Sequence, residues 1–509
     1  MKSKIQLLFF LLFIAIQSAF SQRYLNSGIE VKVVPNTKMI VNFDHTLRPW
    51  HGFGVNYVEA CQTRNYQLFQ QDYSGFSFAT PETKATIMEM VFGADGLRPG
   101  LTKLFLDPFH EGLAIEDNDN DDPYDINLDG YDHRTTTENM RYFNREGLQM
   151  MKAWGGDLVA LATLYAPAPW MTQQKYILGR DLDPELKPEV AEYMASWAKF
   201  LREVEGIPVN YISFHNEGDA YYRWPRDGSN PGEDHRDYNT YWTPQQVAEF
   251  LKITRKVLDA NGLEEVGLSP GETQTWYRFD QWGYASAIVH DQEALANLDL
   301  MTSHSFAYLE GLQSVYYGDY RSIGQDLIQA HKEGVPVWVT SRPWTEGADF
   351  IENIRRDIYE SKANGIIPWA PISGANQWLE ADNTYSDGSM DAAFLIKEDG
   401  SLVINKGYYY FKQVSRAGQP GSKVAEVFNY DPSLGVLAFS GDEKTIVIIN
   451  KSENTKDVEI TVDGLTSPAL TGFRTSANEN YAKIADADVT DSKFTYTAPS
   501  RSVTTFFGK

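Results

Sequence analysis

The chain has 509 residues, which is enough for one large barrel domain and a satellite domain. Its 42% hydrophobic and 22% charged residues form an ordinary globular mixture. The 45 Lys and Arg against 69 Asp and Glu give a net charge of −24, which argues against nucleic acid or an anionic membrane as the main partner. This charge still permits a locally basic cleft for an anionic sugar.

The N-terminus predicts a secretory signal peptide over residues 1–21. Two Lys residues precede an apolar run over 5–16, and Ala19 and Ser21 stand at positions −3 and −1 of the expected cut. The apolar run is too short for a membrane span. We therefore expect a secreted or periplasmic protein that is not membrane-bound. Cys61 is the one cysteine, so no internal disulfide can form.

Two patterns flank the centre of the chain. Residues 22–46 contain two short alternating segments, at 29–34 and 39–43, that lie ahead of any barrel and need strand partners elsewhere. Residues 416–509 contain short strand patterns separated by turn residues, which predicts a small β-sandwich. We expect the N-terminal strands to complete this sandwich.

Residues 47–415 alternate between strand and helix patterns, the signature of a parallel α/β sheet. About eight strand-helix units fit a (β/α)8 TIM barrel with insertions. The expected strands lie at 50–56, 97–105, 157–164, 211–217, 266–269, 298–303, 335–340 and 366–369. The expected helices lie at 81–92, 139–154, 188–204, 243–262 and 408–414. The predicted fold is therefore an α/β barrel with an appended β-sandwich.

A barrel presents its catalytic side chains where its strands end. The buried strand 211–217 ends in Asn216-Glu217, and a carboxylic acid beside an amide is half of the machinery of glycoside hydrolysis. Taken alone, Glu217 fits better as an acidic residue in the N-cap region of the next helix, and the surrounding pattern reverses this preference. The other strand ends supply aromatic, His and Asn side chains, and such a rim favours a carbohydrate cleft over a cofactor site.

These residues resemble a known family. Gly52-Phe53-Gly54 opens the barrel, and Trp338-Val339-Thr340 forms the seventh strand. Other matching features are Glu59 after the first strand, the Pro-rich turn at Trp170, Asn216-Glu217, His304, and the sandwich assembled from both chain ends. In their order and spacing they resemble the clan A retaining glycoside hydrolases, most closely glycoside hydrolase family 30. The resemblance covers nearly the whole mature chain.

The resemblance implies roles for individual residues. Glu217 would be the general acid/base, which needs a raised pKa in a partly dry pocket. Asn216 would hold the 2-hydroxyl of the bound sugar. The remaining substrate-binding candidates are Trp170, His304, Trp369, Trp378 and Arg98.

The sequence departs from the family at the nucleophile. Ser341 stands where the family has a Glu, and a hydroxyl without a base does not form the glycosyl intermediate. Three interpretations follow: an engineered knockout, a hydrolase that recruits another carboxylate, or a carbohydrate-binding homologue without activity. Glu346 is the first candidate for recruitment, although it equally suits the N-terminus of the following helix. Glu272, at the end of the fifth strand, fits a structural role better.

Other chemistry is poorly supported by the sequence. The acidic stretch 116–122 offers oxygen ligands for calcium but lacks the EF-hand pattern, which favours a solvated loop. The nine His residues show no zinc spacing, so we expect no metal, and no cofactor motif is present. We expect a monomeric hydrolase that cleaves β-glycosidic bonds in a plant or algal cell-wall type of poly- or oligosaccharide. A lyase or an inverting hydrolase on the same rim is a further alternative.

Overall fold

The computed structural model describes residues 37–57, 76, 79–106, 119–134, 137–176, 179–229, 239–306, 320–374, 392–397 and 399–508. Several sequence predictions lie outside the described residues: the signal peptide, the strand at 29–34, Glu59, Cys61 and Trp378.

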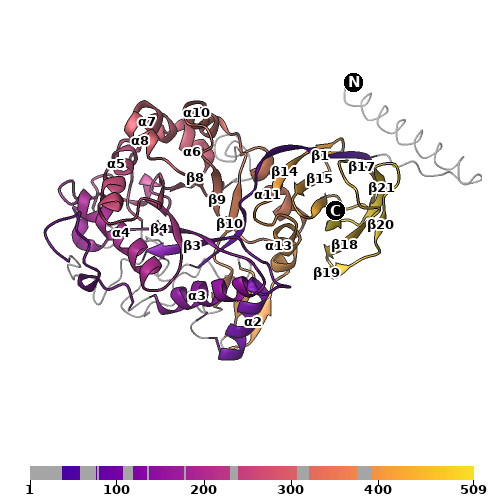
Figure 1. Ribbon diagram of the computed structural model, residues 1–509, viewed down its shortest axis with the longest axis horizontal. Helices are drawn as coiled ribbons and strands as arrows, with labels where there is room; N and C mark the ends of the chain where they lie inside the picture. Colours follow the sequence, from indigo (N-terminus) through magenta and orange to yellow (C-terminus); the bar gives the residue numbers. More distant parts are fainter. Residues whose placement is uncertain are drawn as a thin grey trace, which may run out of the picture.

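The parallel sheet forms a closed barrel (Figure 1). Its order is β6-β5-β4-β3-β2-β10-β9-β8-β7, and every adjacent pair is parallel. β6 and β7 stand at the two ends of this order, yet only Pro270 and Gly271 separate them in sequence. They are two pieces of one strand, so the ring closes with eight strands and confirms the predicted (β/α)8 barrel. The strands are β2 Gly52–Asn56, β3 Leu101–Leu106, β4 Val159–Leu164, β5 Val209–Ser213, β6 Gly267–Ser269, β7 Glu272–Thr273, β8 Met301–Ser303, β9 Val337–Arg342 and β10 Gly365–Pro368.

Helices cover the outside of the barrel (Figure 1). Among them, α5 Pro244–Ala260 begins with helix-start signals in the sequence: Thr243 caps it by accepting a hydrogen bond from the Gln246 N–H (3.1 Å), and Pro244 occupies its first turn. The main helices are α2 Pro81–Phe92, α3 Glu138–Ala153, α4 Lys187–Glu203, α5 Pro244–Ala260, α10 Ile323–His331, α11 Ala348–Tyr359 and α13 Lys406–Ala417. Shorter ones are α6 Trp276–Gln281, α7 Tyr284–His290, α8 Gln292–Ala296 and the 3-10 turns η1 Leu128–Gly130, η2 Pro169–Met171 and η3 Tyr221–Arg223.

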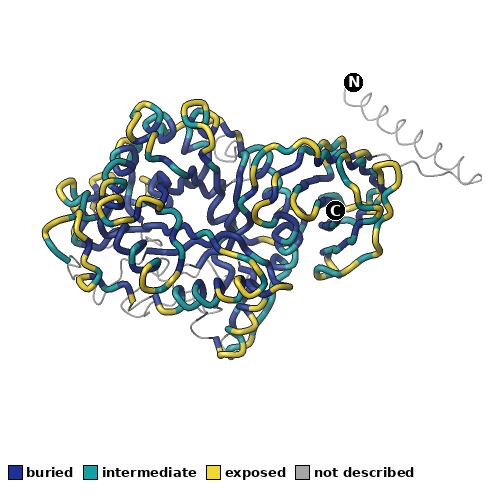
Figure 2. Tube along the Cα trace, viewed as in Figure 1, coloured by how far each residue is buried: buried dark blue, intermediate teal, exposed yellow. Residues whose placement is uncertain are grey.

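The barrel strands are buried along nearly their whole length (Figure 2). β3 and β9 are buried at every position. Their outward-facing apolar residues pack against the helices, as expected for strands covered on both sides. Polar side chains are nevertheless buried within the barrel strands, among them Lys103 of β3, Thr163 of β4 and Thr340 of β9. Buried polar groups need partners, and these three find them at one place in the barrel.

The second sheet joins the two ends of the chain (Figure 1). β1 Thr37–Pro49 lies between β14 and β17, antiparallel to the first and parallel to the second. The ten-stranded sheet folds over on itself, because Ile448 of β16 and Ile460 of β17 belong to one apolar cluster. Its other strands are β14 Lys423–Asn429, β15 Leu434–Ser440, β16 Lys444–Asn450, β17 Lys456–Asp463, β18 Ala469–Ser476, β19 Glu479–Lys483, β20 Ala487–Asp488, β21 Lys493–Ala498 and β22 Ser502–Gly508. This region is the appended β domain that the sequence predicts.

α13 packs between the barrel and the second sheet. The ring of Phe411 lies 5.6 Å from that of Phe53 in β2 and 5.0 Å from that of Trp344. On its other side, Gln413 donates a hydrogen bond to Thr475 of β18 (2.9 Å). A small sheet of β11 Ile372–Gly374, β12 Phe394–Ile396 and β13 Leu402–Ile404 precedes the helix. Within the described part of the chain, no helix is both long enough and apolar enough to cross a bilayer.

Candidate active site

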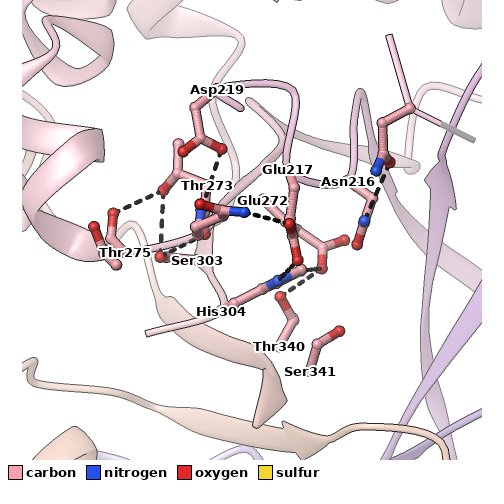
Figure 3. Close-up of polar contacts among 12 residues, drawn as sticks. Asn216, Glu217, Asp219, Glu272, Thr273, Thr275, Ser303, His304, Thr340 and Ser341 are labelled. Carbon is pink, nitrogen blue, oxygen red and sulfur yellow. Dashed lines mark hydrogen bonds and ion pairs between the residues drawn. The ribbon is translucent and has the colours of Figure 1, made fainter. Parts of the chain in front are cut away.

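The candidate site lies where β5 and β7 end. Past Ser213 the chain keeps pairing with β7: the Glu272 N–H donates to the His215 carbonyl (2.8 Å) and the Glu217 N–H to the Glu272 carbonyl (2.7 Å). Glu217 itself has φ +48°, a left-handed conformation that costs a non-glycine residue about 1–3 kcal/mol. The C-terminal rim of the barrel therefore holds Glu217 and Glu272 side by side (Figure 3).

Three donors surround the Glu217 carboxylate. Oε1 accepts from His304 Nδ1 (3.1 Å), while Oε2 accepts from Gln274 Nε2 (2.6 Å) and from the guanidinium of Arg223. Burial favours the neutral acid, but the charge of Arg223 and the hydrogen bonds from His304 and Gln274 outweigh it and lower the pKa of Glu217 below its usual range. The expectation of a raised pKa is therefore wrong for the site as it stands. Glu217 is ionised because cationic donors compensate the burial of its charge.

Glu272 is the second carboxylate of the site and is fully buried. It accepts hydrogen bonds from Lys103 (2.6 Å), Thr163 (2.5 Å), Thr340 (2.5 Å) and His304 Nε2 (3.2 Å). Burial raises its pKa, but Lys103 and His304 more than offset this, so the pKa of Glu272 lies well below the ordinary value. Three of these donors lie on Oε2 and Thr163 lies on Oε1, and the carboxylate has no exposed surface.

His304 bridges the two carboxylates (Figure 3). Both ring nitrogens face acceptor-only oxygens, so both carry a proton and the ring is an imidazolium. Burial opposes this charge, yet the hydrogen bonds to Glu217 and Glu272 raise the pKa of His304 above its ordinary value. The ring is 1% exposed. The structure thus places His304, predicted as a substrate contact, between two acids.

Ser341 lies at the end of β9, beside Lys103. Its Oγ accepts a hydrogen bond from Lys103 Nζ (3.2 Å), which also reaches Asn216 Oδ1 (3.4 Å). Ser341 is buried and has φ +67°. Lys103 donates to Ser341 and is ion-paired with Glu272, so its position is that of a donor to the Ser341 hydroxyl and not of a base. Among the residues that the structure describes, Ser341 therefore has no base of the kind that an oxygen nucleophile needs.

Glu346 lies away from this group. Its carboxylate is exposed and accepts a hydrogen bond from the Lys406 N–H (3.1 Å) at the start of α13. An acidic side chain at a helix N-terminus satisfies a backbone donor that has no partner within the helix. The structure therefore does not bring Glu346 to Glu217, and the helix it caps is α13, whereas the sequence suggested α11.

The predicted substrate-binding residues separate into two groups. Trp170 of η2 and Trp369 are half-buried and follow the C-terminal ends of β4 and β10, the face on which Glu217 lies. Asn216 joins the site through Lys103. The placement of Arg98 at the site is wrong. The strand begins at Leu101 and not at residue 97, so Arg98 precedes its N-terminal end, on the opposite face of the barrel, where it stacks 4.2 Å above the ring of Trp154.

The sequence did not identify several members of the site. Gln274, Arg223 and Thr163 carry no motif that would have marked them. Lys103 does carry a signal, because it lies within the apolar stretch 101–106 and a Lys in a buried strand needs a charged partner. No group of three His, Cys, Asp or Glu side chains suited to a metal ion occurs among the residues that the structure covers. Of the acidic stretch 116–122, residues 119–122 are described.

The fold is similar to that of solved family 30 glycoside hydrolases. It combines a closed (β/α)8 barrel, which has ionisable groups at its C-terminal rim, with a β domain built from both chain ends. The structure of a GH30 endoxylanase from Clostridium papyrosolvens C71 matches with a TM-score of 0.63 and 19% identity, over 93% of this chain and all of that one. The endo-β1,6-glucanase BT3312 matches with a TM-score of 0.64 and 16% identity, over 92% of this chain and 93% of that one.

A curated protein that is similar in sequence also bears the name of a xylanase. Glucuronoxylanase XynC of Bacillus subtilis is 22% identical over 332 residues, which are 63% of this chain and 65% of that protein. The match spans just under two-thirds of the relative's length. No family model matches the chain. The resemblance to glycoside hydrolase family 30 that the motif order predicted is thus confirmed by similarity in sequence and fold.

Proposed function

We propose that the protein is a secreted glycoside hydrolase that cleaves β-glycosidic bonds in a plant or algal cell-wall type of poly- or oligosaccharide, with Glu217 as the general acid/base. One observation carries this proposal: Glu217 lies at the C-terminal rim with three donors on about four acceptor positions, which leaves one position for a sugar oxygen. The xylanase and glucanase relatives favour a β-linked polysaccharide as the substrate.

In this reaction, Glu217 must protonate the leaving oxygen. An ionised Glu217 cannot do so until it gains a proton, and two of its donors, Arg223 and His304, are the groups that keep it ionised. A sugar that enters the rim and displaces Arg223 would remove one of these charges. Glu217 then becomes a stronger base and can hold the proton that the leaving oxygen needs.

The attacking group differs from that of a retaining enzyme. Within the described residues, the buried carboxylates of the site are Glu217, Glu272 and Asp219. Glu272 is engaged by four donors, and Asp219 is ion-paired with Arg278 (2.8 Å). Ser341 supplies a hydroxyl without a base. A water molecule is therefore the attacking group that we propose, as in inverting glycosidases.

A carbohydrate-binding protein without catalytic activity is the second candidate. Ser341 in place of a carboxylate and the lowered pKa of Glu217 both favour it, because each weakens one half of the two-carboxylate mechanism. Such a protein would hold a glycan on the same rim and release no product.

Sugar release from a panel of polysaccharides separates the two candidates. The panel contains glucuronoxylan, unsubstituted xylan, β-1,6-glucan, mixed-linkage β-glucan and β-galactan, and new reducing ends are measured with the wild type, Glu217→Gln and Glu346→Gln. We expect release from at least one glycan, a loss of about 10²–10⁴-fold in Glu217→Gln, and wild-type rates in Glu346→Gln. Retention of a glycan on an affinity gel without any release would establish the binding protein instead.

Secretion and oligomeric state belong to the same proposal. Residues 1–21 have the pattern of a cleaved signal peptide, and we propose that the mature protein begins at Gln22 and acts as a monomer. The N-terminal mass of the protein recovered outside the cytoplasm, together with its mass by light scattering, tests both statements.

A further inference from the structure

Glu272 has no contact with substrate in the proposed function, yet it lies at the centre of the site. It is fully buried, 169 residues from Lys103 in sequence and 2.6 Å from its ammonium group. A buried carboxylate with an ion-pair partner and two hydroxyl donors stays ionised. It can therefore only accept a hydrogen bond from His304, and the proton on His304 Nε2 is fixed.

This constraint leaves one variable proton position on the ring. Nδ1 lies 3.1 Å from Glu217 Oε1. When Glu217 is ionised, Nδ1 carries the proton and donates it; when Glu217 is protonated, Nδ1 is free to accept. The two atoms therefore hold a single proton between them, and Glu217 and His304 titrate as one unit.

We propose that Glu272 is a positioning residue that acts through His304: by fixing the proton on Nε2, it makes Nδ1 the store of the proton that Glu217 uses in catalysis. This inference rests on the proposed function. In the resting site the proton is on Nδ1. When the sugar arrives, the N–H bond at Nδ1 breaks and an O–H bond forms on Glu217, and His304 becomes neutral while still donating from Nε2 to Glu272. Glu217 gives its proton to the leaving oxygen. The attacking water, on the opposite face of the sugar, loses its proton to solvent, and solvent returns a proton to the pair after the product leaves.

The charged groups around His304 agree with this assignment. Glu217 and Glu272 hold the two nitrogens, and both stabilise the imidazolium. Lys103 on β3 opposes it but is itself paired with Glu272. His215 on the chain after β5 is buried and has its pKa lowered to about 3, so it remains neutral and adds no competing charge.

Histidine nitrogen resonances of the full-length protein test the proposal without relying on activity. In protein labelled with ¹⁵N-histidine, the signals absent from His304→Gln identify His304. We expect both nitrogens to be protonated at pH 7, with a titration midpoint above the ordinary value of about 6.5. In Glu272→Gln the midpoint should fall by about one pH unit or more, because one of the two anions is lost.

Matched variants separate charge from packing. Thr163→Val removes a donor to Glu272 but keeps its charge, so the midpoint should not fall. If Glu272→Gln fails to fold, the double variant Lys103→Met/Glu272→Gln removes both buried charges. Its midpoint should fall relative to that of Lys103→Met, because Lys103 by itself opposes the charge of His304. In wild type and Glu272→Gln, the alkaline limb of the pH profile of kcat/KM should move with the midpoint.

The outcomes distinguish this proposal from the proposed function. A neutral His304 at pH 7 would overturn the proton store. So would a midpoint that is the same in Glu272→Gln as in wild type, or the same in the double variant as in Lys103→Met. A wild-type protein that releases no sugar from any glycan, while His304 titrates as expected, would overturn the hydrolase and leave Glu272 as the residue that sets the charge of the ring.

Discussion

Replacing Lys103 by Met should expose how much the barrel depends on its buried ion pair. Lys103 and Glu272 are both 0% exposed and lie 2.6 Å apart, and Met fills nearly the same volume without the charge. The variant leaves Glu272 as a buried anion without a cation, which costs about 3–5 kcal/mol. The lost hydrogen bonds to Ser341 and Asn216 are part of the same change. Against a typical stability of about 5–15 kcal/mol, this is a large loss.

Urea unfolding followed by tryptophan fluorescence measures this loss at pH 7. The double variant Lys103→Met/Glu272→Gln should recover most of it, because no charge is then left buried without a partner. The loss should also shrink as the pH falls towards the unfolded Glu pKa of about 4.3, because burial without a cation raises the pKa of Glu272 in Lys103→Met above that value and the carboxyl takes up a proton. A single variant that costs less than about 1 kcal/mol, or a double variant equal to the sum of the two single ones, would refute the reasoning.

Three further predictions concern the site and its surroundings. If residue 341 faces the sugar, Ser341→Glu should raise the rate of hydrolysis of aryl β-glycosides at least tenfold, because Lys103 then stabilises a carboxylate where a hydroxyl now stands. An unchanged rate would show that residue 341 does not act as the nucleophile position. Glu346→Gln should cost at most about 1 kcal/mol in thermal unfolding, since it weakens only the contact with the Lys406 N–H; a loss of binding or activity would place Glu346 in the site after all. His304 has a raised pKa in the folded state, so its contribution to stability is complete below the unfolded pKa of about 6.5 and is lost as the pH rises through the folded pKa. Urea titrations from pH 6 to 9 should show this decline in stability, and His304→Gln should abolish it.

The sequence by itself determined the architecture. Alternating strand and helix patterns over residues 47–415 specify a parallel barrel, since strands covered by helices on one side and filled on the other are apolar throughout. The same patterns predicted that Asn216 and Glu217 lie at the rim, because catalytic side chains follow the strands that end there. The order of motifs also indicated the family resemblance, which the comparisons confirm.

Only the tertiary structure decided the chemistry around Glu217. His304 and Glu217 are 87 residues apart in sequence. Neither local segment indicates that the His304 ring contacts the carboxylates of both Glu217 and Glu272. The pKa of Glu217 follows from Arg223 and Gln274, whose side chains reach it through turns that local patterns do not specify. Arg98 illustrates the same limit, because a strand that begins four residues later than expected moves a side chain to the other end of the barrel.

The physical reason is a difference in range. Hydrophobic periodicity and helix caps act over a few residues, so a sequence displays them directly. Electrostatic environment depends on which charges folding brings within a few ångströms, and Lys103, Glu272 and His304 come from three different strands and their ends. Local patterns therefore predicted where the acid of this barrel lies, and the folded ring determined which groups surround that acid.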